Sequence, residues 1–83
     1  MDARRKKILF QSKHRGTKEL DLCLGNFAED SIGTMTESDL TLFESILSEK
    51  DLDVYDWIFR NQSPPEHQNH RILEALRLFS KKV

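Results

Sequence analysis

Residues 14–29 read HRGTKELDLCLGNFAE. The second part of this stretch predicts an amphipathic helix, because its apolar residues recur at i, i+3, i+4, i+7 and i+8, the spacing of one helical face. The residues on this face are Leu20, Cys23, Leu24, Phe27 and Ala28. We therefore expect this helix to pack against the core of an all-α domain.

A second stripe appears if the helix is extended back by one turn, and it carries Arg15, Glu19, Leu22 and Asn26. An Arg–Glu pair within a helix contributes only about 0.2–0.5 kcal/mol, whereas Gly16 inside a helix costs about 1 kcal/mol relative to alanine. Helix stability therefore does not explain this combination. Two interpretations remain open: a kinked helix junction with solvated charges, or a turn at Gly16 that another group approaches closely.

Length and cysteine content limit the classes of protein that fit. The 83 residues predict one helical domain, residues 1–83, with a stability of about 4–12 kcal/mol. Cys23 is the only cysteine, so no intramolecular disulfide can form, and its place on the apolar face favours an inert buried thiol. No apolar run reaches the length of a membrane span, so we expect no membrane insertion.

Charge is segregated along the chain although the net charge is −1. Residues 1–18 are basic and residues 19–56 are acidic, which predicts oriented docking on a charged partner and faster association at low salt. The basic segment 4–18 leaves open an alternative function, a small nucleic-acid-binding helical protein. That alternative lacks the strongly basic balance and the interleaved aromatic residues typical of such proteins.

Apolar periodicity and capping residues predict about five helices, near residues 3–13, 17–30, 37–49, 52–61 and 64–80. Predicted caps are Thr36, Asp51 and Ser63, the last in a capping box with Glu66 and with Pro64 at the first helical position. The predicted core positions are one of Ile8, Leu9 and Phe10, then Leu40, Phe43, Ile46, Leu47, Trp57, Ile72, Leu73, Leu76, Phe79 and Val83.

The predicted helix 52–61 is apolar nearly all round. One stripe carries Val54, Trp57 and Ile58, and the other carries Leu52, Tyr55 and Phe59. Such a helix is either central in the fold or partly covered by a partner. Central packing is favoured, because a domain of this size needs its largest side chains for the core.

Residues typical of catalysis or metal binding are few. His67 and His70 lie at i and i+3 near Glu66 and Glu74, but a third strong ligand at suitable spacing is missing for a metal cage. No nucleophile stands in a recognisable motif, and the three glycines are isolated. We therefore expect neither a metal site nor enzymatic activity.

The segment from Arg15 to Glu19 resembles the Arg-Gly-x-x-Glu signature of the flavinylation factors, the small assembly factors for the flavoprotein subunit of succinate dehydrogenase. The Leu-x-Leu-Gly-x-Phe continuation at residues 22–27 and the Asp-x-x-x-Trp of residues 53–57 follow in the order found in that family. The acidic helix near residue 40 and a final helix begun by proline also fit. The resemblance covers nearly the whole chain.

The resemblance implies an all-helical protein that binds the flavoprotein subunit and helps FAD become covalently attached to a histidine of it. Related members also serve fumarate reductase. It implies that Arg15, Gly16 and Glu19 lie at the partner contact, and we group His14, Lys18 and Leu22 with them. We expect no stably bound cofactor, a monomer when free and, because the long N-terminal extension of mitochondrial members is missing, a bacterial cytoplasmic protein.

These assignments carry an expectation for stability. If Arg15 and Glu19 face a partner, replacing either by alanine lowers the stability by no more than about 0.5 kcal/mol. A bulky residue at Gly16 costs more if the backbone there has a positive φ.

Overall fold

The computed structural model describes residues 1–82, which fold into five α-helices and two short 3-10 turns without a strand. The elements are α1 (Ala3–Lys13), α2 (Lys18–Ser31), η1 (Ile32–Thr34), α3 (Glu37–Leu47), α4 (Asp51–Phe59), η2 (Glu66–Gln68) and α5 (Arg71–Ser80). The predicted all-α bundle of about five helices is confirmed. Val83, predicted to be a core residue, lies outside the described residues.

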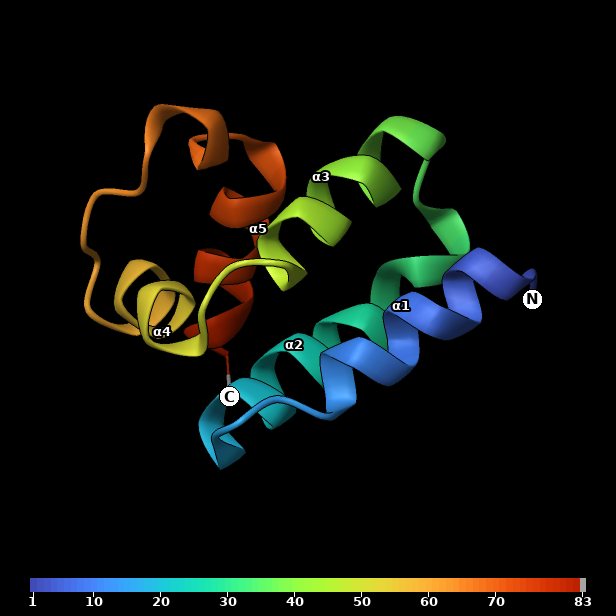
Figure 1. Ribbon diagram of the computed structural model, residues 1–83, viewed down its shortest axis with the longest axis horizontal. Helices are drawn as coiled ribbons and strands as arrows, with labels where there is room; N and C mark the ends of the chain where they lie inside the picture. Colours follow the sequence, from blue (N-terminus) through green and yellow to red (C-terminus); the bar gives the residue numbers. More distant parts are fainter. Residues whose placement is uncertain (83) are drawn as a thin grey trace.

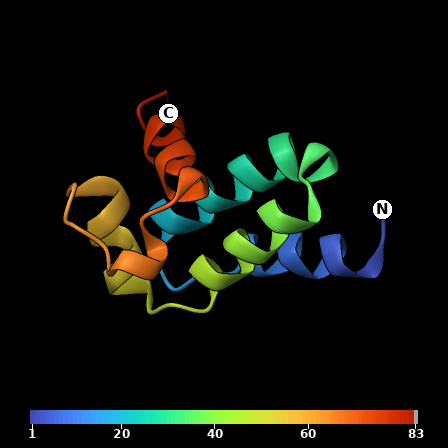
Figure 2. The ribbon, with the colours of Figure 1, turned by 90° about the horizontal axis from the view of Figure 1, so that it is seen from above.

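The helices surround one apolar core. α1 and α2 lie side by side and antiparallel, while α4 and α5 occupy the other end of the molecule (Figure 1, Figure 2). α5 packs against α2, α3 and α4. The ring of Phe27 meets Phe43 and Phe79 edge-on, with centroids 5.6 and 5.7 Å apart, so aromatic contacts join α2, α3 and α5.

Most predicted core faces are confirmed. The five apolar residues of α2 named above are each at most 6% exposed, and the predicted residues of α3 are buried too. Trp57 is 6% exposed, which confirms its place in the core. In α1 it is Ile8 that is fully buried, whereas Phe10 is 63% exposed.

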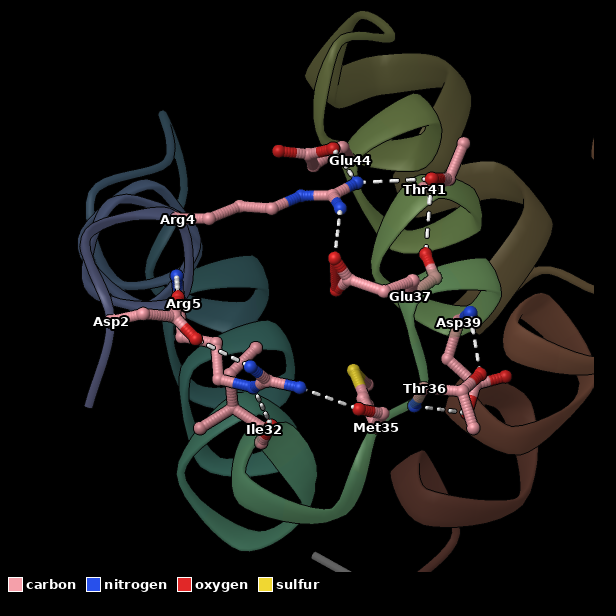
Figure 3. A network of polar contacts seen from close by, with 10 residues as sticks. All are labelled: Asp2, Arg4, Arg5, Ile32, Met35, Thr36, Glu37, Asp39, Thr41 and Glu44. Atoms are coloured by element: carbon pink, nitrogen blue, oxygen red, sulfur yellow. Dashed lines mark hydrogen bonds and ion pairs between the residues drawn. The ribbon is translucent and has the colours of Figure 1, made fainter.

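Three helix starts form through side-chain caps of the expected kind of residue, which are Asp2 for α1, Thr17 for α2 and Thr36 for α3. Thr36 accepts a hydrogen bond from the Asp39 N–H, and the Asp39 carboxylate accepts one from the Thr36 N–H, each at 3.1 Å (Figure 3). This reciprocal capping box fixes the start of α3, as predicted from Thr36. Thr17 caps α2 by accepting from the Leu20 N–H at 3.2 Å.

One predicted helix start and two predicted caps are wrong. The last helix begins at Arg71 and not near residue 64, because a proline disfavours helical backbone in the residue before it and the chain there contains Pro64-Pro65. His70 takes the capping role assigned to Ser63, accepting from the Leu73 N–H. Asp51 is the first residue of α4 and does not cap it.

The basic start of the chain packs against its acidic middle. Arg4 of α1 pairs with Glu44 of α3 at 2.7 Å and with Glu37 at 3.5 Å (Figure 3), and Lys13 pairs with Glu29 of α2. Basic and acidic segments that are separate in the sequence therefore pair with each other at the surface of the fold. These pairs reduce the separation of charge that the sequence predicts.

Candidate functional site

Residues 14–17 form a loop between two helices, not a helical turn. α1 ends at Lys13 and α2 begins at Lys18, with Thr17 as its cap. Arg15 therefore does not share a stripe of α2 with Glu19. Of the two interpretations of this stretch, the turn at Gly16 with a close approach is confirmed, and the approaching group is the Asp51 carboxylate of the same chain.

The Arg15 side chain points into the protein and is only 10% exposed. Its guanidinium donates to the main-chain oxygens of Leu47 at 2.6 Å and Glu49 at 3.0 Å, and it pairs with Asp51 at 2.7 Å. These contacts hold the end of α3 and the start of α4 against the loop. Loss of them leaves a partly buried carboxylate without its charged partner, so the expectation that Arg15→Ala is nearly neutral no longer stands.

Gly16 leaves room for the close approach of Asp51. Its N–H donates to Asp51 Oδ2 at 2.6 Å, and a Cβ at Gly16 would overlap that oxygen. No glycine among residues 1–82 has a positive φ, so the conformational reason considered for Gly16 does not apply. Gly25 is a second position of close approach, because Lys13 at the end of α1 lies against it. The Lys13 Cγ is 3.1 Å from the position that a Cβ at Gly25 would take.

The other four predicted partner-binding residues are exposed or partly exposed. Glu19 lies in the first turn of α2 and its carboxylate has no hydrogen bond or ion pair to any residue within 1–82. Leu22 is 52% exposed, Lys18 is exposed, and the His14 ring stacks on Phe10 with centroids 4.1 Å apart. The signature thus divides into Arg15 and Gly16, which are bound to Asp51 of the same chain, and an exposed part centred on Glu19.

Sequence reasoning missed the residues that complete this surface. The second stripe of α4 is exposed beside Glu19, since Leu52 is 70% and Phe59 37% exposed while Tyr55 is partly buried. The sequence contained a signal for this surface, because α4 is apolar nearly all round. Central packing was favoured over contact with a partner as the reason for that pattern. Asp51 was missed as the partner of Arg15, because no local spacing rule links positions so far apart in the chain.

The two histidines considered as metal ligands serve the fold instead. His67 Nε2 lies 3.1 Å from the Glu49 carboxylate, and His70 Nε2 lies 2.9 Å from the fully buried Gln68 side chain. Gln68 in turn donates to Glu49 at 2.9 Å. No cluster of three or more metal-ligating side chains is found within residues 1–82.

Cys23 is buried on α2, as predicted from its helical position. Burial raises the pKa of its thiol to about 11, so the nucleophilic thiolate is scarce at neutral pH. Its role is packing, and it supplies no reactive group to the surface around Glu19.

The basic segment 4–18 offers few free cations for a nucleic-acid backbone. Arg4, Lys13 and Arg15 pair with carboxylates of other elements, and Arg5 pairs with Asp2. Phosphate binding depends on cations that replace condensed counterions, and these four are already neutralised. The structure therefore weakens the nucleic-acid alternative.

Residues 6–80 match the model of the family described as the flavinator of succinate dehydrogenase. The chain belongs to this family. The matched range contains the loop 14–17, Glu19 and the exposed stripe of α4. Membership confirms the resemblance that was carried by the Arg-Gly-x-x-Glu segment.

The names of individual relatives agree with the match to the flavinator family. The "FAD assembly factor SdhE" of Acetobacter pasteurianus is 41% identical over 74 residues, which cover 89% of this chain and 68% of the relative. "Succinate dehydrogenase assembly factor 2, mitochondrial" of Dictyostelium discoideum is 40% identical over 73 residues, covering 88% of this chain and 52% of the relative. The Saccharomyces cerevisiae protein of the same name is 34% identical over 84 residues, covering 96% and 52%. The chain thus spans about half the length of these mitochondrial relatives.

One property of this flavinator-family chain concerns membranes. Within the part of the chain that the structure describes, no helix combines the length and the apolar character needed to cross a bilayer.

Proposed function

We propose that this flavinator-family chain binds the flavoprotein subunit of succinate dehydrogenase and promotes the covalent attachment of FAD to it. The observation that carries the proposal is the family match over residues 6–80. The names of the relatives, a FAD assembly factor and succinate dehydrogenase assembly factors, support it. The exposed surface around Glu19 provides the site for the subunit.

The proposed role is that of a non-catalytic assembly factor. The signature supplies one free carboxylate, Glu19, on a rigid scaffold, and the remaining polar groups of the signature hold that scaffold together. In this proposal FAD stays with the flavoprotein subunit, and the chain binds no cofactor of its own.

The test is covalent flavin on the flavoprotein subunit, read as flavin fluorescence on a denaturing gel, in cells that lack the endogenous factor. The chain is expected to restore the fluorescent band, and Glu19→Gln is expected to reduce it strongly. Asp30→Asn is the matched control, because Asp30 is an exposed carboxylate on the same helix but at its other end. Absence of a fluorescent band with the wild-type chain would refute the proposal.

Three further properties extend the proposal. The flavoprotein subunit of fumarate reductase, tested in the same assay, shows whether the chain serves both enzymes. A cytoplasmic location stays a prediction, since the relatives include a bacterial protein and mitochondrial ones, and cell fractionation of the native host checks it. The monomeric state when free is checked by sedimentation velocity.

A further inference from the structure

Glu19 lies between two hollows on the surface of the protein. The first hollow, of about 470 Å³, is lined by Thr17, Glu19, Asp51, Leu52, Tyr55 and Arg60. The second, of about 220 Å³, is lined by Glu19, Leu22, Cys23, Asn26 and Phe59. Because Glu19 borders both, the carboxylate stands at the centre of one continuous surface formed by α2 and α4.

This surface is unusually apolar for exposed positions. Leu22, Leu52 and Phe59 are three of the six large hydrophobic residues that are exposed among those described. The Tyr55 ring lies 4.8 Å from the Phe59 ring and 5.7 Å beneath the Arg60 guanidinium. Single exposed apolar side chains are ordinary, whereas these adjoin one another along the two hollows that Glu19 borders.

The charge at the centre restricts what the surface can receive. A partner that covers both hollows removes water from Glu19, and a carboxylate that loses water without gaining a cation strongly destabilises the complex. Within residues 1–82 no cation pairs with Glu19, and Arg15, the cation of the signature, is committed to Asp51. Arg60 lines the first hollow, but it lies over the Tyr55 ring and pairs with Asp56 at 3.7 Å. A cation supplied by the partner is therefore the group that offsets the charge of Glu19 in a covered site.

We propose that Glu19, Leu22, Leu52, Tyr55 and Phe59 form one docking surface for a segment of the flavoprotein subunit in which a lysine or arginine stands between two apolar side chains. The cation pairs with Glu19, and the flanking side chains enter the two hollows. This inference rests on the proposed function and names the chemistry of its binding site. It assigns α4, which lies outside the signature, an equal share of the contact.

A second copy of the chain fits this surface poorly. In a two-fold symmetric dimer the same patch faces itself, which brings Glu19 close to the Glu19 of the other copy. Two carboxylates in a shared dry site repel each other. The segment of the flavoprotein subunit is therefore the occupant to which the proposal commits, and self-association through this face is an outcome that would contradict it.

The first test compares two exposed leucines. Leu52→Ser is expected to weaken binding of the isolated flavoprotein subunit at least tenfold in titration calorimetry, as is Glu19→Gln. Leu78→Ser is the matched control, because Leu78 of α5 is 59% exposed and lies outside both hollows, and it is expected to bind within twofold of the wild type. Circular dichroism verifies the fold of each variant.

The outcomes separate this inference from the proposed function. If the wild-type chain does not bind the subunit, both fail. If the wild type binds and Leu52→Ser binds equally well, or Leu78→Ser weakens binding as much, the docking surface is wrong while the proposed function stands. Sedimentation velocity of the wild type that shows a dimer abolished by Leu52→Ser would assign the surface to self-association and overturn the inference.

The second test identifies the segment that is bound. A photo-crosslinking amino acid at position 52 is expected to capture one peptide of the flavoprotein subunit that contains a lysine or arginine with apolar neighbours. The same group at position 78 is expected to give no such product. Capture at position 52 of a peptide without a basic residue would overturn the proposed chemistry of recognition.

Discussion

Arg15 and Glu19 stand four residues apart, but the side chain of Arg15 is largely buried and that of Glu19 is exposed. The guanidinium of Arg15 is held by two carbonyl oxygens and the Asp51 carboxylate inside the chain, while the Glu19 carboxylate faces solvent. One signature therefore contains a positioning residue and a contact residue. Loss of function on substitution has a different origin at each of them.

This division predicts different losses of stability. We expect Arg15→Ala to lower the free energy of unfolding by about 2–3 kcal/mol, because hydrogen bonds to a charged group are lost and the carbonyls at the end of α3 lose their donor. Glu19→Ala is expected to change it by no more than about 0.5 kcal/mol. Urea denaturation followed by circular dichroism measures both. Equal losses at the two positions would contradict the division.

Gly16 permits a second prediction at the same scale. A methyl group there collides with the Asp51 carboxylate and breaks the hydrogen bond from the Gly16 N–H, so Gly16→Ala is expected to destabilise the protein by about 1–2 kcal/mol. At Gly33 nothing lies within 4 Å of the added Cβ, so Gly33→Ala is expected to be neutral or slightly stabilising. Thermal melts of the two variants provide the comparison, and a milder effect at Gly16 than at Gly33 would refute the collision argument.

Sequence reasoning located the signature but not the direction of its side chains. Helical spacing can place Glu19 and Leu22 on α2, because neighbours on a helix are set by local geometry. The burial of Arg15 depends on where α3 ends and α4 begins, which are set by tertiary packing. For the same reason Asp51 was predicted as a helix cap, although its carboxylate is bound by Arg15 and Gly16.

At the scale of helices, three arginines make the same kind of contact with the main chain. Each reaches from its own element to main-chain oxygens near the end of another, and each side chain is largely buried, at 22% exposure for Arg5, 10% for Arg15 and 16% for Arg77. The acceptor oxygens belong to Ile32 and Met35 for Arg5, Leu47 and Glu49 for Arg15, and Trp57 and Gln62 for Arg77. The last carbonyls of a helix lack partners within it, and a guanidinium can serve two at once because its donors lie in a planar fork.

The start of α5 depends on the protonation state of His70. Its Nδ1 accepts from the Leu73 N–H at 3.4 Å, which requires an unprotonated nitrogen, and its Nε2 lies beside the Gln68 side-chain oxygen. Burial, with smaller contributions from Arg71 and His67, lowers the pKa of His70 below its usual value of 6.5. The unfolded chain therefore takes up this proton at a higher pH than the folded protein does. The contribution of His70 to stability is full above about pH 6.5 and is lost as the pH falls.

The measurement is unfolding free energy as a function of pH. We expect the wild type to lose stability as the pH falls below about 6.5 and His70→Asn to lose less over the same range, because asparagine caps a helix without titrating there. Glu49, whose pKa is lowered by hydrogen bonds from Gln68 and His67, adds a loss only at lower pH. Parallel curves for the two proteins would show that another group is responsible.

At the scale of the whole molecule, stability rests on one small core to which every α-helix contributes. Trp57 is its largest side chain and is 6% exposed. Trp57→Ala is expected to cost about 3–5 kcal/mol, a large share of the roughly 4–12 kcal/mol that a chain of this length has in total. Leu52→Ala on the same helix, at a 70% exposed position, is the control and is expected to stay within about 0.5 kcal/mol. Thermal melts followed by circular dichroism measure both effects. A melting temperature of Trp57→Ala equal to that of the wild type would place Trp57 outside the core.

The number and type of helices followed from periodicity because the apolar faces of α2, α3 and α5 are regular. The start of α5 could not be predicted in this way. The residues around Ser63 carry a capping pattern, but the adjacent prolines keep the backbone extended. The exposed stripe of α4 was also not predictable as a surface. Periodicity counts apolar positions around a helix, and only the packing of the other helices decides which of them are covered.

The contacts of the three arginines with main-chain oxygens affect which sequence changes this fold accepts in evolution. A main-chain oxygen is present whichever amino acid occupies the position, so a substitution at Glu49 or Gln62 leaves the acceptor for the guanidinium in place. Such a contact imposes no paired substitutions on the two positions. Correlated changes among homologous sequences are therefore expected to link Arg15 with Asp51, whose side chains meet, and to leave the links from Arg77 to α4 unseen, although these links tie the helices together.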